Sequence, residues 1–160
     1  GALSEEASHA QPVIDLVRRT RPRALVIPHG GDRHPDHGAA HRLLATAIFK
    51  AGLRRHVTSD PAWQAEWVCS YFINDAVTPS FVVDVSEHYD IKRRALACHA
   101  SQFAPSGAAA VSTRLTSVRF QQLIESRDAQ FGAQSGVAFA EGFIVRHPVL
   151  LDHLLVHPRS

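Results

Sequence analysis

The sequence predicts an α/β domain with a mainly parallel sheet, and two observations support this prediction. Segments with apolar residues three and four positions apart, typical of amphipathic helices, alternate with short runs rich in β-branched and aromatic residues, typical of strands. Such alternation is the pattern of a parallel sheet covered by helices. The length of 160 residues suits one domain with a sizeable core.

The first third of the chain predicts helix, strand and helix in that order. The first helix is expected to begin at Ser4, whose hydroxyl can cap it, and to end before Pro22. Residues 23–28 form a short apolar run that predicts a buried central strand. The second helix is expected to start at Pro35 and to end at Gly52, after a Gly-Gly loop.

The remaining elements follow from the same patterns. Strands are predicted over residues 65–72, 81–85 and 137–145, a helix from Ser86 to about residue 101, and a long helix over residues 113–134. Between the two helices, residues 104–110 form an uncharged loop of Pro, Gly, Ala and Ser. The alternation of these helices and strands supports the prediction of an α/β fold.

Composition argues against two classes of function. No apolar run reaches the roughly 18 residues that a membrane span needs. The net charge of +2 is small and the basic residues are dispersed, unlike those of a nucleic-acid-binding protein.

Cys69 and Cys98 lack the spacing of a metal site and are interpreted as free thiols of a cytoplasmic protein. The unusual feature is the count of 11 histidines.

Three of these histidines lie where ligands bind in α/β proteins. The run His34-Pro35-Asp36-His37 follows the first predicted strand and opens a helix, at the carboxyl edge of the sheet. His37 and His41 are four residues apart and share a helix face. Neutral imidazoles are ordinary zinc ligands, and Asp36 could orient one of them by accepting its second N–H. The run therefore predicts one part of a metal site.

A purely structural interpretation of the same residues stays open. Asp36 is favourable in the first turn of a helix without any metal, and two histidines three apart often have no shared role. His41 alone suits an ordinary helix face. Glu141 could be a buried carboxylate or could point outward from its strand, and the histidines near the C-terminus suit a solvated surface.

Four stretches together resemble the LmbE-like (PIG-L) zinc deacetylases. They are residues 32–37, 79–86, 99–103 and 136–143. The resemblance is greatest to the branch that deacetylates N-acetylglucosaminyl-malate in bacillithiol biosynthesis. It implies a Rossmann-like three-layer sandwich with a mainly parallel sheet and a bound Zn²⁺. It also implies a small amino-sugar conjugate as substrate, a cytoplasmic location and a homo-oligomer, with no nucleic-acid or membrane partner.

The resemblance implies roles for the matching residues. His37 would be a zinc ligand, His34 would stabilise the oxyanion or protonate the leaving amine, and Asp36 would orient a neighbouring histidine. Arg33 would help to shape the substrate pocket. Roles in support of the site are implied for Asp32, Gln102 and Glu141. The family often has tyrosine where this chain has Phe139.

The chain departs from the family at its beginning. Family members start with a strand that ends in His-Pro-Asp-Asp, which supplies two further zinc ligands and the general base, and no such motif precedes Ser4. We therefore expect residues 1–160 to be the C-terminal portion of one deacetylase domain, lacking its first strands. About 60–80 residues would be missing if they form two strand-helix units. Alone, the chain is expected to be inactive, to bind zinc weakly and to associate through uncovered apolar surface.

Two alternatives to this enzyme are left open. The chain could be a non-catalytic relative that binds a sugar or a protein partner. It could also belong to a deacetylase of another N-acetylglucosaminyl conjugate, such as the inositol conjugate. In the intact enzyme, zinc would activate a water molecule and polarise the amide carbonyl, so that hydrolysis releases acetate and a free amine.

Overall fold

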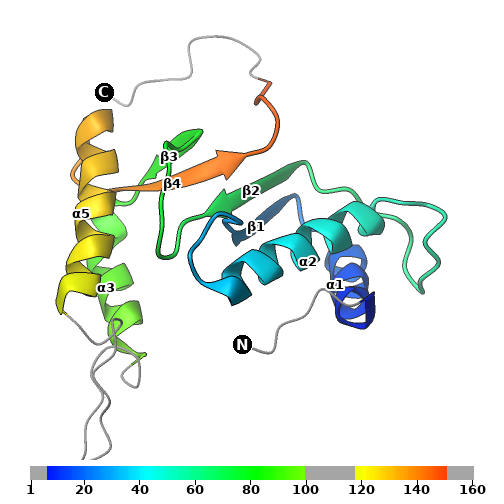
Figure 1. Cartoon of the computed structure of the whole chain (residues 1–160). Helices are drawn as coiled ribbons and strands as arrows, with labels where there is room; N and C mark the ends of the chain where they lie inside the picture. The colour runs from blue at the N-terminus through cyan, green and yellow to red at the C-terminus, as the bar shows by residue number, and fades with distance from the viewer. Residues whose placement is uncertain (1–6, 100–117, 151–160) are drawn as a thin grey trace, which may run out of the picture.

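The computed structural model describes residues 7–99 and 118–150 (Figure 1). Its elements, in chain order, are α1 (Ala7–Thr20), β1 (Ala24–Pro28), α2 (Pro35–Ala51), β2 (Trp67–Tyr71), β3 (Phe81–Asp84), the short 3-10 helix η1 (Ser86–His88), α3 (Tyr89–Ala97), α5 (Val118–Ser135) and β4 (Ala140–Val145). The expected order of helices and strands is confirmed. The predicted cap Ser4, the loop 104–110 and the first residues of the long helix lie outside the described residues.

The described strands form one mixed sheet in the order β1-β2-β4-β3. Strands β1 and β2 are parallel, with Val26 opposite Cys69, whereas β4 runs antiparallel to both β2 and β3. The α/β class is confirmed, but the expectation of a mainly parallel sheet is wrong for this part of the chain. Hydrophobic periodicity identifies a strand without giving its direction. Between α5 and β4, Gly136 has a φ of +76°, a conformation that favours glycine.

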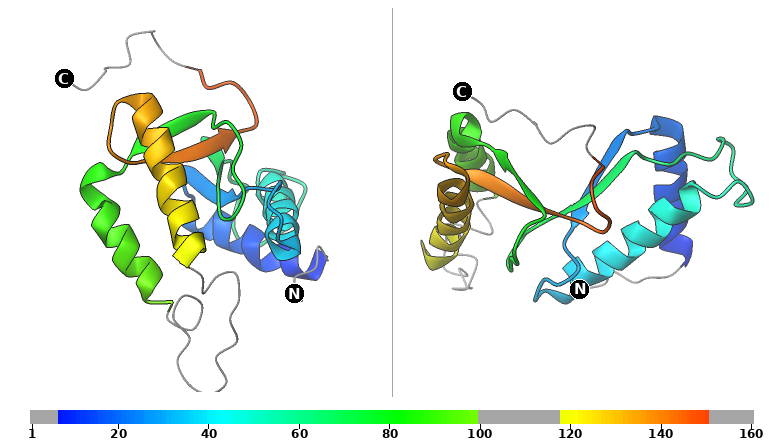
Figure 2. Two further views of the ribbon diagram at one scale, coloured as in Figure 1. Left: turned by 60° about the vertical axis from the view of Figure 1, so that its left-hand side comes forward. Right: turned by 90° about the horizontal axis from the view of Figure 1, so that it is seen from above.

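Helices lie on both sides of the sheet, as a three-layer sandwich requires. Viewed from above in Figure 2, α1 and α2 lie on one side, near β1 and β2, while α3 and α5 lie on the other side, near β4 and β3. Direct contacts between α2 and β1 and between α5 and β4 confirm this arrangement. No helix within the described residues is both long and apolar enough to cross a membrane.

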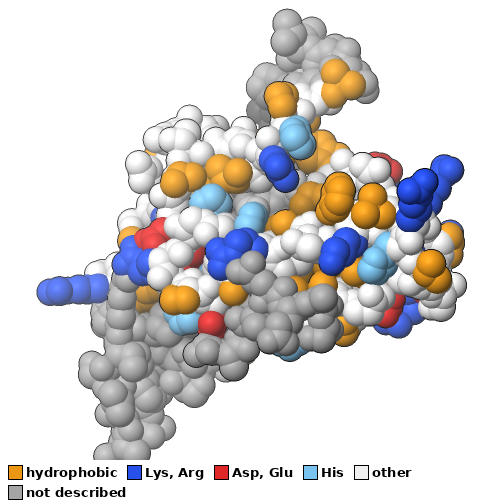
Figure 3. Space-filling view, turned by 45° about the vertical axis from the view of Figure 1, so that its right-hand side comes forward, with side chains coloured by type: hydrophobic (Ala, Val, Ile, Leu, Met, Phe, Trp, Pro, Cys, Tyr) orange, Lys and Arg blue, Asp and Glu red, His pale blue; other side chains and the backbone are white. Residues whose placement is uncertain are grey.

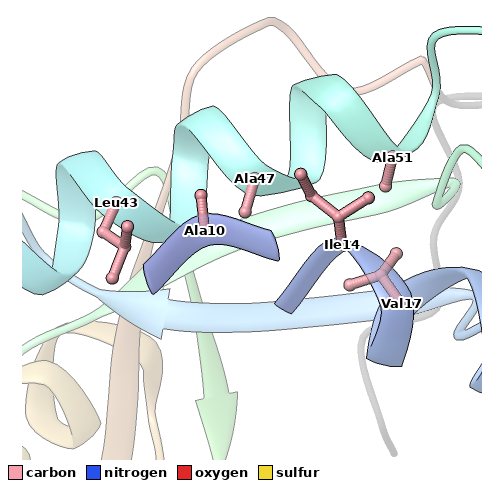
Figure 4. Packing of buried hydrophobic residues seen from close by; sticks show 6 residues of the cluster. All are labelled: Ala10, Ile14, Val17, Leu43, Ala47 and Ala51. Carbon is pink, nitrogen blue, oxygen red and sulfur yellow. The ribbon is translucent and has the colours of Figure 1, made fainter. Parts of the chain in front are cut away.

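The first core cluster joins α1 to α2. Ala10, Ile14 and Val17 of α1 pack against Leu43, Ala47 and Ala51 of α2 (Figure 4). Alanines at the contact allow the two helix backbones to approach closely, and the larger Ile14 and Leu43 fill the space between them. The first helix thus buries one apolar face through Ala10, Ile14 and Val17, whereas Leu16 is 48% exposed.

A second core cluster lies between α5 and the sheet. Phe72, Phe131 and Ala140 are buried together. Gly142 of β4 is required here, because a Cβ atom at this position would lie 2.7 Å from the ring of Phe131. This packing holds α5 against the strands that form the floor of the cleft described below.

Strand β1 lies at the edge of the described sheet, not at its centre. Only β2 pairs with it within the described residues, and Val26 is 55% exposed. The expectation of a buried central strand is therefore not met in this part of the chain, although the expected unpaired side of the strand is present. Apolar composition indicates a surface that can be buried, but it does not identify the segment that covers it.

Arg18 connects the ends of the first two helices. Its buried guanidinium donates from Nε to the carbonyl of Ala51 and from Nη2 to Leu53, at 3.0 and 2.7 Å. Through Nη1 it donates to the carbonyl of His56 and the hydroxyl of Thr58, both at 2.7 Å. The cation thus satisfies carbonyl groups at the C-terminus of α2, where the helix dipole also favours positive charge.

We predict that Arg18→Met lowers the free energy of unfolding by about 3 kcal/mol, because it leaves several partly buried carbonyl groups without a donor. Arg19→Met is the matched control at an exposed position of the same helix turn, and it is expected to change stability by less than about 0.5 kcal/mol. Urea denaturation measures both. Equal effects of the two substitutions would show that the buried hydrogen bonds contribute little.

Candidate functional site

The loop after β1 brings the histidine-rich stretch to the carboxyl edge of the sheet. The His29 N–H continues the strand pairing by donating to the carbonyl of Tyr71 at 2.9 Å. Gly30 is needed because a Cβ atom there would lie 2.7 Å from the ring of His41. His41 turns back toward β1 and donates from Nδ1 to the carbonyl of Pro28 at 2.8 Å, so it stabilises the loop.

His34 begins α2 as its N-cap residue. Its Nδ1 accepts from the backbone N–H of Asp36 at 3.2 Å, and Pro35 occupies the first helical position. Its ring stacks on that of His37, with centroids 4.7 Å apart. Because Nδ1 accepts a hydrogen bond, the single ring proton of neutral His34 is assigned to Nε2.

Asp32 is the hub of the site. Its carboxylate accepts from the backbone N–H of His34 at 2.9 Å, from the Asn74 N–H at 2.7 Å and from Asn74 Nδ2 at 2.9 Å. It also bonds His37 Nδ1 at 2.9 Å. The Asp32 side chain is only 1% exposed, and burial alone would raise its pKa. The hydrogen bonds from Asn74, His34 and His37 outweigh burial and lower the pKa to about 2.

The Asp32 carboxylate determines which nitrogen of His37 is available. A carboxylate accepts but does not donate, so His37 Nδ1 carries a proton and the lone pair of a neutral ring lies on Nε2. This arrangement of carboxylate and imidazole is the one that orients metal-binding histidines in proteins. For His37 the orienting carboxylate is therefore Asp32, for which the resemblance implied a supporting role. That Asp36 orients a neighbouring histidine stays a prediction, and its backbone N–H is capped by the His34 side chain.

Arg33 lies at the rim of the site and is fixed by Asp75. Its backbone N–H donates to Asp75 Oδ2 at 2.8 Å, and its Nε donates to Oδ1 at 2.7 Å. The Nη2 group makes a further ion pair with the same carboxylate. The guanidinium is half exposed and lines the cleft, which agrees with the expected pocket-shaping position.

A cleft of about 740 Å³ lies beside these residues. Arg33, His34, His37 and Asn74 line it near the start of α2, while residues of α3, α5 and β4 line it elsewhere. In Figure 1 the start of α2 and the pair α3 and α5 lie on opposite sides of the β2 end. Figure 3 shows basic and histidine side chains next to one another on one face of the molecule, with hydrophobic side chains around them. The volume is in the range of small-molecule sites.

A network of ionic side chains forms the wall of the cleft on α3, α5 and β4. The buried Asp128 accepts from Tyr89 Oη at 3.1 Å, from Lys92 Nζ at 2.7 Å and from Arg127 Nε at 3.1 Å. Lys92 also pairs with Glu141. Burial and the neighbouring Asp128 carboxylate raise the pKa of the Tyr89 hydroxyl.

Phe139, at a position where the resembled family often has tyrosine, lies beside this ionic network. The Phe139 ring stacks on Tyr89, with centroids 3.8 Å apart and planes within 4°. The Tyr89 hydroxyl donates to Asp128, and the Ser86 hydroxyl accepts from the Phe139 N–H at 3.1 Å. Phe139 supplies a stacking surface without a hydroxyl of its own.

The structure brings most of the predicted site residues to one cleft. Arg33, His34, His37 and Glu141 line it, and Asp32 lies directly behind His37, whereas Gln102 lies outside the described residues. The sequence analysis did not identify Asn74, although a polar residue just beyond a strand is a signal of a site at the sheet edge. Asp128 gave no such signal, because it lies inside a long helical pattern.

The described residues do not by themselves hold a metal. Among residues 7–99 and 118–150, no group of three or more His, Cys, Asp or Glu is arranged as a set of metal ligands. His37 offers one oriented nitrogen, and a catalytic zinc usually takes three protein ligands. These residues therefore do not complete the zinc site that the resemblance implied.

The low pKa of Asp32 predicts how its contribution to stability varies with pH. The folded pKa of about 2 lies below the unfolded value of 3.8, so the stabilisation is fully present above pH 4 and is lost as pH falls toward 2. Its size is about 2 kcal/mol by linkage. We predict that Asp32→Asn lowers the free energy of unfolding by about this amount at pH 7, measured by urea denaturation.

The same measurement between pH 5 and pH 2 provides the control. The difference in the free energy of unfolding between the parent chain and Asp32→Asn should become smaller as pH falls, because the carboxylate of the native protein becomes protonated. Asp90→Asn replaces an exposed aspartate of α3 and is expected to leave the pH profile unchanged. A difference that stays constant down to pH 2 would contradict the assignment.

No protein-family model matches the sequence. The chain is 30% identical over 128 residues to the 1D-myo-inositol 2-acetamido-2-deoxy-alpha-D-glucopyranoside deacetylase of Rhodococcus opacus strain B4. This alignment covers 59% of the chain and 44% of the relative, so the chain spans less than half of that protein.

Solved structures share the fold. The conserved protein TT1542 from Thermus thermophilus is 29% identical with a TM-score of 0.82, and the match covers 94% of this chain and 63% of TT1542. The N,N'-diacetylchitobiose deacetylase from Pyrococcus horikoshii is 18% identical with a TM-score of 0.71, over 89% of this chain and 52% of that protein. The second likeness concerns the fold alone. The sequence likeness to a deacetylase and the fold shared with TT1542 are in line with the resemblance to the LmbE-like (PIG-L) family.

Proposed function

We propose that the whole protein is a hydrolase that removes the acetyl group from an N-acetylglucosaminyl conjugate. The observation that carries this proposal is the pair of Asp32 and His37, whose atoms lie 2.9 Å apart beside a cleft of small-molecule size. The name of the Rhodococcus relative supports an acetylated amino sugar as the substrate class. The activity is proposed for the whole protein, since the chain spans 44% of that relative.

We propose Zn²⁺ as the cofactor, with His37 Nε2 as one of its ligands. The support is the carboxylate of Asp32 on the opposite ring nitrogen, which fixes the tautomer and orientation that a metal ligand needs. Among the described residues no group of three potential ligands is present, so the site would be completed from outside them. When bound in hydrolases of this kind, zinc supplies an activated water molecule and polarises the carbonyl.

We propose His34 as the donor that stabilises the developing oxyanion. Its Nδ1 accepts from the Asp36 N–H, so the neutral ring keeps a proton on Nε2 that it can donate to the substrate oxygen. Protonation of Nδ1 as well would abolish the N-cap hydrogen bond of α2. This geometry favours hydrogen-bond donation by His34 over the protonation of the leaving amine. A catalytic role of the Asp36 carboxylate stays a prediction.

The proposal leaves two candidates for the conjugate that is the substrate. N-acetylglucosaminyl-malate, the bacillithiol precursor, is one candidate, and the inositol conjugate named for the Rhodococcus relative is the other. A cytoplasmic location is in line with the two free thiols, Cys69 and Cys98. A homo-oligomeric state of the whole protein stays a prediction.

A non-catalytic module that binds a sugar is the alternative function. It is favoured by the absence of a complete ligand set within the described residues. The two functions differ in whether the whole protein, loaded with zinc, releases acetate from an acetylated amino sugar. Stoichiometric binding of the sugar without release of acetate would support the module.

We predict that His37→Ala weakens zinc binding of the whole protein at least about 100-fold and abolishes acetate release, because it removes a metal ligand. His34→Ala should retain zinc and lower kcat by about 100-fold to 1000-fold, the range for loss of one oxyanion donor. Calorimetric zinc titration and an acetate assay measure these effects. His88→Ala, at an exposed position of η1, is the control and should alter neither. Normal zinc affinity of His37→Ala would contradict the proposed ligand.

A further inference from the structure

We propose that Asn74 binds the N–H group of the substrate acetamide through its side-chain oxygen Oδ1, and that it thereby selects acetamides over acetate esters. The inference rests on the proposed function, because it concerns how the acetylated amino sugar is held. Asn74 lies in the loop after β2 and lines the cleft together with His34 and His37.

The hydrogen bonds of Asn74 determine how its carboxamide is oriented. Its Nδ2 donates to Asp32 Oδ1 at 2.9 Å, while its backbone N–H donates to Asp32 Oδ2 at 2.7 Å. A carboxylate only accepts hydrogen bonds, so the nitrogen of the carboxamide has to face Asp32. The reversed orientation would place an amide oxygen against the carboxylate. Oδ1 therefore points away from Asp32.

The Oδ1 atom is an available hydrogen-bond acceptor. Within residues 7–99 and 118–150, the hydrogen bonds of Asn74 involve its two nitrogen atoms and not Oδ1. In the same part of the chain, no buried side-chain nitrogen or oxygen lacks a hydrogen-bond partner, so Oδ1 is accessible and not buried. Because Asn74 lines the cleft, this acceptor is available to a ligand in it.

Asn74 belongs to the histidine side of the cleft. Its Nδ2 lies 3.4 Å from His37 Nδ1, and the His34 ring stacks on the ring of His37. His34 Nε2 is the proposed donor to the carbonyl oxygen of the acetamide. A secondary amide also has an N–H group, which needs an acceptor when it leaves water. Asn74 Oδ1 supplies this acceptor, so His34 and Asn74 bind the two polar groups of one amide.

An acetate ester lacks the N–H group. Its bridging oxygen would face Asn74 Oδ1, which is also an acceptor, and Oδ1 would lose its contact with water without gaining a hydrogen bond. Sites that bond an N–H group discriminate against analogues without it, because a polar group of the protein is then left unpaired. Asn74 therefore distinguishes an N-acetyl from an O-acetyl group on the same sugar.

Asn74 could instead serve only to hold the Asp32 carboxylate. In that case its loss would disturb Asp32 and His37, and it would weaken the binding of an acetamide and of an ester by the same factor. A hydrogen bond from a sugar hydroxyl to Oδ1 would have the same consequence, because both ligands carry that hydroxyl. The ratio of the two dissociation constants therefore separates the proposed role from these alternatives.

The test is equilibrium binding of two methyl α-glycosides to the whole protein in the presence of a chelator, so that no turnover takes place. The probes are methyl N-acetyl-α-glucosaminide and the methyl α-glucoside with an acetate ester at the same carbon. Calorimetry should give a dissociation constant at least about threefold lower for the acetamide. In Asn74→Leu, which removes Oδ1 and keeps a similar shape, we expect this preference to fall at least about threefold, mainly through weaker binding of the acetamide.

Asn74→Ala removes the same oxygen and decides the question if Asn74→Leu does not fold. Gln130→Leu is the matched control, because Gln130 is an exposed carboxamide of α5 that does not line the cleft. It should leave both dissociation constants unchanged. An ester that binds the parent protein as tightly as the acetamide would overturn the inference, and so would an equal loss of both affinities in the Asn74 variants. If the preference depends on Asn74 but the zinc-loaded protein releases no acetate, the proposed function fails and the role of Asn74 in binding stands.

Discussion

The arrangement of the site depends on one buried carboxylate, that of Asp32. A charge that is 1% exposed is tolerated only when hydrogen bonds replace the lost water, and here the donors come from the loop before α2, from α2 itself and from the loop after β2. Asp32 therefore connects segments about forty residues apart in the chain. Because these donors belong to the folded protein, His37 is oriented by folding, before any ligand binds.

The position of Asn74 is in turn connected to the other wall of the cleft. Arg127 of α5 donates from Nη1 to the carbonyl of Ile73 at 3.0 Å, and its Nε donates to Asp128. The residue next to Ile73 is Asn74, which holds Asp32. This hydrogen bond from the Arg127 side chain to a backbone carbonyl joins the ionic wall to the histidine side of the cleft. The helix that carries Arg127 is held in turn by the packing of Phe131 against Gly142 of β4.

The sequence predicts those features that depend on residues close together in the chain. It predicts less well the features that depend on contacts between distant segments. Periodicity located the helices, and the run from His34 to His37 located the site, because Pro35 and a capping group determine a helix start locally. Asp32, five residues before His37 in the sequence, was expected only to support the site, whereas in space its carboxylate bonds His37 Nδ1 at 2.9 Å. The direction of β4 and the edge position of β1 depend on pairings that periodicity does not encode.

The two sides of the cleft use carboxylates for opposite purposes. Asp32 is enclosed by donors that prefer its charged form, so it serves as a fixed acceptor and leaves His37 Nε2 available. Asp128 is enclosed by cations, so its charge is cancelled and it fixes Lys92 and Arg127 in place. The side with the fixed acceptor therefore orients an imidazole, whereas on the other side ion pairs hold Lys92 and Arg127 in place. Each wall of the cleft is ordered by one buried carboxylate, which is balanced by hydrogen-bond donors at Asp32 and by cations at Asp128.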